Sequence, residues 1–98
     1  MGNILVLGSS NTDMTVKTAT LPAPGETVLG GDFTMSPGGK GANQAVAAIR
    51  AGGEVSFICK VGRDQFGDNA LDHYSEEGID ISASLRSDRP SGVALITV

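Results

Sequence analysis

The order of segments along the chain constrains its fold more than any other feature. Residues 3–8 form a short apolar run closed by Gly-Ser-Ser, a pattern typical of a buried strand followed by a loop. The alanine-rich residues 41–51 predict a helix that ends at a pair of glycines. Residues 54–62 predict a second strand, and residues 64–77 a second helix. Because this order is typical of parallel strands joined by right-handed crossovers, we predict an α/β core.

The second predicted helix has recognisable ends and one apolar face. Asp64 is placed to cap its first turn, and Gly78 can end it in the left-handed conformation. The side chains expected on the apolar face are Phe66, Ala70, Leu71 and Tyr74. A second set, Asp64, Asp68, Asp72 and Glu76, falls at four-residue intervals, and we interpret it as a solvated face rather than a metal site.

Three further strand-like segments do not fit this core. They cover residues 14–17, 27–35 and 83–98, and Pro24-Gly25 suits the centre of a type II turn. More than thirty residues separate the first core strand from the first helix, too many for an ordinary connection. We therefore predict an antiparallel flap, or lid. The core would comprise residues 1–10 and 39–80, and the lid residues 13–37 and 81–98.

The sequence also suggests a part of a larger protein. The apolar run 92–98 stops without a turn, a cap or a charge. Two core strands alone would leave both edges of a parallel sheet open and much apolar surface uncovered. We therefore expect residues 1–98 to be a fragment of one domain.

Composition argues against several functional classes. With 11 acidic and 7 basic side chains the formal net charge is −4, and no cluster of Lys or Arg suggests nucleic acid or an anionic membrane as a partner. The apolar stretches are far shorter than the roughly 20 residues of a membrane-spanning helix. Residues 1–7 lack the features of a secretory leader, so a cytoplasmic location is expected. A single cysteine, Cys59, and a single histidine, His73, cannot build a zinc site. Cys59 is expected to be a core residue, and His73 to be structural or exposed.

Two polar side chains follow the first core strand at its carboxyl end, where open α/β sheets bind ligands. Asn11 and Asp13 together offer a carboxamide and an anionic acceptor, which suit neighbouring hydroxyls of a sugar. The same residue types also stabilise turns. Spacing alone favours the turn role.

The strongest local motif is the glycine-rich run 37–44, which leads into the first helix. Such a run exposes backbone N–H groups and lets a ligand approach the main chain closely. It is not a phosphate-binding P-loop, because Thr34 stands where that motif has its first glycine and Gly41 where it has Ser or Thr. The dinucleotide pattern fails as well. Lys40 and Asn43 could contact a ligand, although a solvated lysine and a local cap are the simpler roles.

With their order and spacing, these segments closely resemble the N-terminal part of the ribokinase-like, or PfkB, carbohydrate kinase family. The segments that carry the resemblance are residues 8–13 (GSSNTD), 24–27 (PGET), 38–47 (GGKGANQAVA) and 61–67 (VGRDQFG). The resemblance covers essentially the whole chain. It implies a ribokinase-like α/β fold with a parallel βαβα core and antiparallel lid strands. The sugar-binding positions that it implies are Asn11, Thr12, Asp13, Gly39, Lys40, Gly41, Ala42 and Asn43.

The resemblance also implies an activity. The family transfers the γ-phosphoryl group of ATP to a sugar hydroxyl, for ribose the one on carbon 5, with Mg²⁺ and a monovalent cation such as K⁺. The lid would cover the sugar and pair two subunits into a homodimer. The family's catalytic base is an aspartate in a Gly-Ala-Gly-Asp motif, which is absent from this sequence. We therefore expect no catalytic residue here, ATP and cation sites beyond Val98, and no turnover by these 98 residues alone.

Two other functions stay open. Another sugar or nucleoside kinase of the same family would share these motifs. A short non-catalytic protein could instead bind a sugar or pair its open strand edges with a partner.

Overall fold

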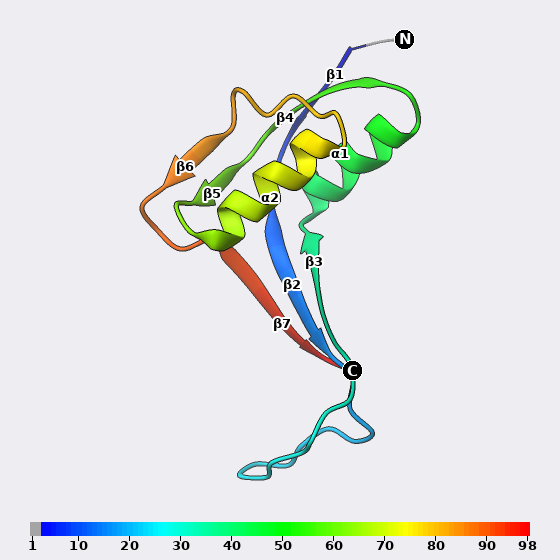
Figure 1. Cartoon of the computed structure of the whole chain (residues 1–98), viewed down its shortest axis with the longest axis vertical. Helices are drawn as coiled ribbons and strands as arrows, with labels where there is room; N and C mark the ends of the chain where they lie inside the picture. Colours follow the sequence, from blue (N-terminus) through cyan, green and yellow to red (C-terminus); the bar gives the residue numbers. More distant parts are fainter. Residues whose placement is uncertain (1–2) are drawn as a thin grey trace.

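The computed structural model describes residues 3–98. Met1 and Gly2, which belong to the predicted core segment 1–10, lie outside the described residues. The elements in chain order are β1 (Asn3–Leu7), β2 (Asn11–Val16), β3 (Phe33–Gly38), α1 (Lys40–Arg50), β4 (Glu54–Ile58), β5 (Lys60–Gly62), α2 (Gln65–Glu76), β6 (Leu85–Ser87) and β7 (Gly92–Thr97). Figure 1 shows a lid of three strands leading away from the two helices.

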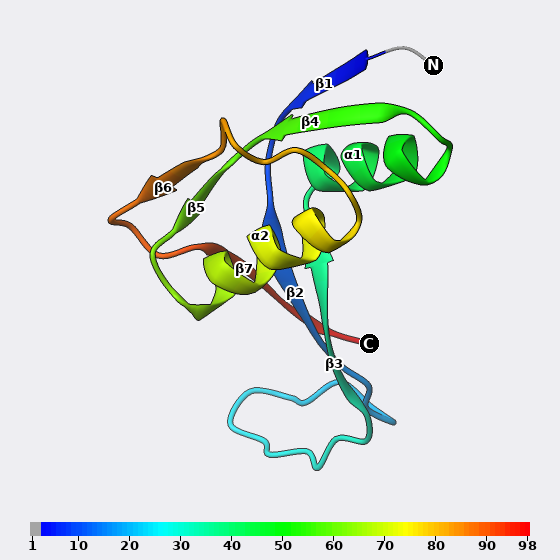
Figure 2. The same ribbon diagram turned by 45° about the horizontal axis from the view of Figure 1, so that its top comes forward.

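The core has the predicted βαβα order. β1 pairs in parallel with β4, and α1 makes the crossover between them. The chain then passes through β5 and α2, and β6 pairs in parallel with β5. Both crossovers advance across the strands in the same direction, so a right-handed path places both helices on one side of β1 and β4, as Figure 2 shows.

An aromatic pair lies at the centre of the core. Phe57 on β4 and Tyr74 on α2 are fully buried and meet edge to face, with ring centroids 5.3 Å apart. Burial raises the pKa of the Tyr74 hydroxyl. Cys59 is also buried, and desolvation raises the pKa of its thiol, so this cysteine behaves as the core residue that was predicted.

Two predictions about the core strands need correction. The segment 54–62 is not one strand, because its partner changes at Cys59. There, the Cys59 amide donates to Ser84 Oγ (3.2 Å), and its carbonyl accepts from the Leu85 amide (2.8 Å). β1 is not buried either, since Leu5 and Leu7 are 66% and 77% exposed. The two helices cover only one of its faces.

The lid is a mixed sheet in the order β3–β2–β7. β2 and β3 are antiparallel, as predicted, but β7 pairs in parallel with β2. The reason is that β2 and β7 both leave the core toward the tip of the lid, whereas β3 returns. The predicted strand 27–35 begins only at Phe33, and residues 85–87 pair with β5 instead of entering the lid.

The loop between β2 and β3 contains the predicted turn. The Glu26 amide donates to the carbonyl of Ala23 at 2.9 Å, and Gly25 has a φ of 76°. A type II turn requires this positive φ at its third position. Elsewhere, α1 and α2 have 11 and 12 residues, and within residues 3–98 no helix has the length and apolarity to cross a bilayer.

The aromatic pair makes a stability prediction. Replacing Phe57 by Leu removes the edge-to-face contact and leaves a cavity, so the free energy of unfolding should fall by about 1–2 kcal/mol. Urea denaturation followed by circular dichroism measures it. Leu29→Ala is the control, because Leu29 is 93% exposed and its loss should cost no more than about 0.5 kcal/mol. Equal losses in the two variants would contradict this picture of the core.

Candidate functional site

Asn11 and Asp13 lie side by side on one face of β2. They are two residues apart in a strand, so their side chains project to the same side. The Asn11 amide Nδ2 donates to Asp13 Oδ1 at 2.8 Å, and both residues are half-buried. The two residues therefore belong to the strand itself, and the turn role that spacing favoured is wrong.

Gly38 on β3 belongs to the predicted glycine-rich run but is not among the expected sugar-binding positions. It pairs with Asn11 in the antiparallel register, and the residue that pairs with Asp13 is Ser36, two positions before it on β3. A Cβ at Gly38 would lie 2.6 Å from both carboxylate oxygens of Asp13. Asp13 can therefore lie against the β3 backbone only because residue 38 has no side chain.

The glycine-rich turn places α1 against the link between β1 and β2. Gly39 caps the helix with a φ of 100°, and a Cβ there would lie 2.7 Å from the Ser9 carbonyl oxygen. A Cβ at Gly41 would lie 2.7 Å from the Gly8 Cα. The Ala42 amide donates to the Ser9 carbonyl at 3.0 Å. Gly39, Gly41 and Ala42 thus hold the helix start beside the strand that carries Asn11.

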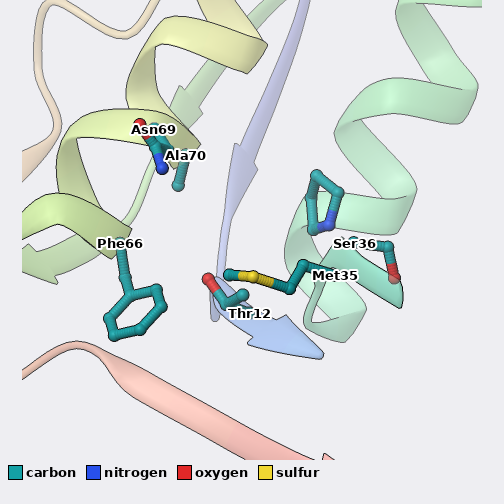
Figure 3. A pocket seen from close by; sticks show the side chains of 7 residues that line it. Thr12, Met35, Ser36, Phe66, Asn69 and Ala70 are labelled. Carbon is teal, nitrogen blue, oxygen red and sulfur yellow. The ribbon is translucent and has the colours of Figure 1, made fainter. Parts of the chain in front are cut away.

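Thr12 does not join this group. Strand alternation points it to the opposite face of the lid, where it lines a cleft of about 170 Å³. Figure 3 shows Met35 reaching toward Thr12, with Phe66, Asn69 and Ala70 of α2 across the opening. Phe66 shares this side of α2 with Ala70, in agreement with the predicted apolar face, but it lies at the cleft and not in the buried core cluster.

The side chains of Asn43 and Lys40 are exposed and lie apart from the Asn11–Asp13 pair. Asn43 is exposed and lines a second hollow between α1 and α2, together with Arg50 and His73. Lys40 is exposed at the first position of α1, and the ion pairs found among residues 3–98 do not include it. The structure thus brings Asn11, Asp13 and the glycine turn together and leaves these two side chains at the margin.

The start of α2 carries a second polar group. Asp64 caps the helix as predicted, accepting from the Gly67 amide at 2.8 Å. It also accepts from the amide and hydroxyl of Ser91, and these bonds, led by the Ser91 amide, hold its pKa below the usual range. Asp68 pairs with Arg86. Two of the four acidic residues assigned to a solvated face, Asp64 and Asp68, therefore have hydrogen-bond or ion-pair partners.

Over residues 3–98 no group of three or more His, Cys, Asp and Glu side chains could hold a metal ion.

A family model for pfkB family carbohydrate kinases matches residues 1–98. The chain belongs to the PfkB family. Among its relatives, the ribokinase of Lactococcus lactis is 42% identical over 99 residues, a match that covers all of this chain and 33% of that protein. The chain thus spans about a third of the length of the relatives it matches.

Solved structures confirm the ribokinase-like fold. The Giardia lamblia ribokinase superposes with a TM-score of 0.91 at 38% identity, covering 100% of this chain and 32% of the other. The Arabidopsis thaliana ribokinase, solved with ribose and ATP, gives a TM-score of 0.85 at 28% identity, covering 95% and 31%. Because the superpositions cover 95–100% of this chain, the lid strands and the βαβα core both occur in these ribokinase structures.

The contact between Gly8 and Gly41 yields a prediction about this turn. Alanine is normally favoured over glycine inside a helix by about 1 kcal/mol. At position 41 the new Cβ would overlap the backbone of Gly8 and Ser9, so Gly41→Ala should instead lower stability by about 1–3 kcal/mol. Thermal unfolding followed by circular dichroism tests this. The exposed Gln44→Ala in the same helix should be neutral or slightly stabilising, and a stabilised Gly41→Ala variant would refute the close contact.

Proposed function

We propose that residues 1–98 form the sugar-binding and lid part of an ATP-dependent kinase that phosphorylates D-ribose on its 5-hydroxyl. The observation that carries this proposal is the Asn11–Asp13 pair, held on the lid face against Gly38. The second oxygen of Asp13 and the amide carbonyl of Asn11 are not used by the bond between them. They can accept hydrogen bonds from two sugar hydroxyls, and the negative charge on Asp13 strengthens the hydrogen bond that this residue accepts.

The glycine turn would provide the other wall of the sugar site. Gly39, Gly41 and Ala42 present backbone to the same region, and Lys40 adds a positive charge at the helix start. Asn43, one residue further, would contact the sugar from the margin. Thr12 would contribute through the backbone of its strand, since its side chain lines the opposite face. A lid over a bound sugar excludes water, which would otherwise compete for the phosphoryl group.

The proposed reaction divides its work between this chain and residues outside it. A bond forms between the 5-oxygen of ribose and the γ-phosphorus of ATP, the bond from that phosphorus to the β,γ-bridging oxygen breaks, and ADP leaves. The hydroxyl proton passes to a carboxylate base, which the family carries in a Gly-Ala-Gly-Asp motif absent from this sequence. We therefore assign the base and the sites for ATP, Mg²⁺ and K⁺ to residues outside these 98. This chain would hold and cover the sugar.

The test is a coupled ATP-consumption assay with ribose and Mg²⁺, on the protein expressed from the complete reading frame. Asp13→Asn should raise the KM for ribose about ten-fold or more, because a charged acceptor for hydroxyls is lost. Asp72→Asn is the control, since Asp72 is exposed on α2. An unchanged KM in Asp13→Asn would remove this residue from the sugar site.

Other acceptors in the same assay decide the substrate. Ribose should be used best among pentoses, hexoses and nucleosides. Turnover only with a nucleoside would replace ribose as the substrate while keeping the family reaction. Turnover of ribose by residues 1–98 alone would contradict the division of labour proposed above.

We propose in addition that the lid joins two copies of the protein. Its face opposite Asn11 and Asp13 carries four exposed apolar side chains, namely Phe33, Met35, Val93 and Leu95. Leu95 is 83% exposed and lies next to Met14 in the sheet. An apolar surface of this kind is typical of an interface between proteins.

Charge on that face should separate the two copies. Leu95→Asp is expected to convert the dimer to a monomer, because the buried contact would have to accommodate a carboxylate. Size-exclusion chromatography with light scattering measures the mass. Leu21→Asp serves as the control, since Leu21 is also exposed but lies in the loop at the tip of the lid. A parent protein that is monomeric at high concentration would exclude this interface.

A further inference from the structure

The last lid strand is attached to the first turn of α2. β7 begins at Gly92, and Ser91 directly before it makes two hydrogen bonds with Asp64, the capping residue of α2. The Ser91 amide donates to Asp64 Oδ2 at 2.8 Å, and the Ser91 hydroxyl donates to Oδ1 at 2.7 Å. The same carboxylate accepts from the Gly67 amide at 2.8 Å. One side chain therefore caps the helix and ties down the start of the lid strand.

Close backbone contacts leave little freedom around this carboxylate. The Gly62 amide at the end of β5 donates to Ser91 Oγ at 2.8 Å. A Cβ at Gly62 would lie 2.6 Å from the Arg89 carbonyl oxygen and from the Ser91 amide nitrogen. A Cβ at Gly67 would lie 2.1 Å from the Gly62 carbonyl oxygen. The start of α2, the end of β5 and the start of β7 thus pack backbone to backbone, and Ser91 cannot shift without disturbing all three.

The sheet register connects this attachment to the candidate sugar site. Gly92 pairs with Asn11, and Ala94 pairs with Asp13. A Cβ at Gly92 would lie 3.4 Å from the Cβ of Asn11, at the near limit of ordinary van der Waals contact. β7 on one edge and β3 on the other therefore hold the β2 segment that carries both polar side chains.

A second contact from the same helix holds the other side of Asn11. Ser10, the residue before Asn11, forms a hydrogen bond through its hydroxyl with the hydroxyl of Tyr74. Tyr74 is fully buried in α2. The Asn11 end of β2 is thus held by α2 twice, through Ser10 directly and through Ser91 by way of β7.

We infer that Asp64 is a positioning residue of the sugar site, which acts through Ser91 and the β7–β2 register to hold Asn11 and Asp13 in place. Asp64 itself does not contact the sugar in this scheme. The part of the inference that concerns sugar affinity rests on the proposed function, whereas the attachment of the lid does not.

Hydrogen–deuterium exchange of the complete protein tests the attachment without reference to activity. Ser91→Ala removes the hydroxyl bonds to Asp64 and Gly62 and leaves the cap on Gly67 intact, so it separates lid anchoring from helix capping. In Ser91→Ala and in Asp64→Asn, amides in residues 11–16 and 92–97 should exchange about ten-fold faster, while those of β1 and β4 keep their parent rates. The control is again Asp72→Asn, on the same helix.

Steady-state kinetics of the same variants test the effect on the sugar. Both should raise the KM for ribose by about five-fold or more, with the KM for ATP and kcat within about two-fold of the parent. A general loss of stability would lower the fraction of folded enzyme and therefore the apparent kcat, while both KM values stayed close to those of the parent, so a rise confined to the KM for ribose distinguishes positioning from damage to the fold.

Each alternative result has a definite meaning. Exchange no faster than in Asp72→Asn, or faster throughout β1 and β4, would overturn the inference. Faster exchange confined to the lid with an unchanged KM for ribose would show that Asp64 anchors the lid but does not position the sugar pair, and the inference would fail on that point. If the parent did not phosphorylate ribose at all, the proposed function would fail, and the exchange experiment would still decide whether Asp64 anchors β7.

Discussion

The arrangement of this molecule depends on a contact between two backbones. Gly8, after the first strand, and Gly41, in the first turn of α1, approach so closely that a Cβ on either one would overlap the other. The close approach allows the Ala42 amide to bond to the Ser9 carbonyl. It fixes the start of the helix beside the start of β2. Since β3 runs directly into the same helix, this contact also sets where the lid leaves the core.

The two faces of the lid differ in chemical character. β2 lies in the middle of the sheet, and alternation along it places Asn11 and Asp13 on one face and Thr12 and Met14 on the other. On β2 and β3 the first face is polar, and it adjoins the glycine turn. The second is largely apolar and exposed beyond the cleft formed with α2. A single strand can therefore present different chemistry on its two sides, because neighbouring residues never share a face.

Sequence reasoning identified the features that depend on neighbouring residues. The cap at Asp64 and the turn at Pro24-Gly25 appear as predicted. Gly52 and Gly78, at the two helix ends, have positive φ values of 97° and 91°. These outcomes are local, since a glycine without a Cβ and a carboxylate near free amides impose their geometry on the next few residues. The motif around Gly39 to Asn43 likewise indicates the PfkB family from the sequence alone.

By itself, then, the sequence determined the order of the core elements, the ends of the two helices and the family. Tertiary structure alone decided that β7 runs parallel to β2 and that Thr12 and Phe66 line the same cleft. It also decided that Gly38 makes room for Asp13 and that Ser91 bonds to Asp64. These features join residues about 25 to 80 positions apart. Their geometry follows from the direction in which strands leave the core and from the space between backbones, neither of which is a property of a short stretch of sequence.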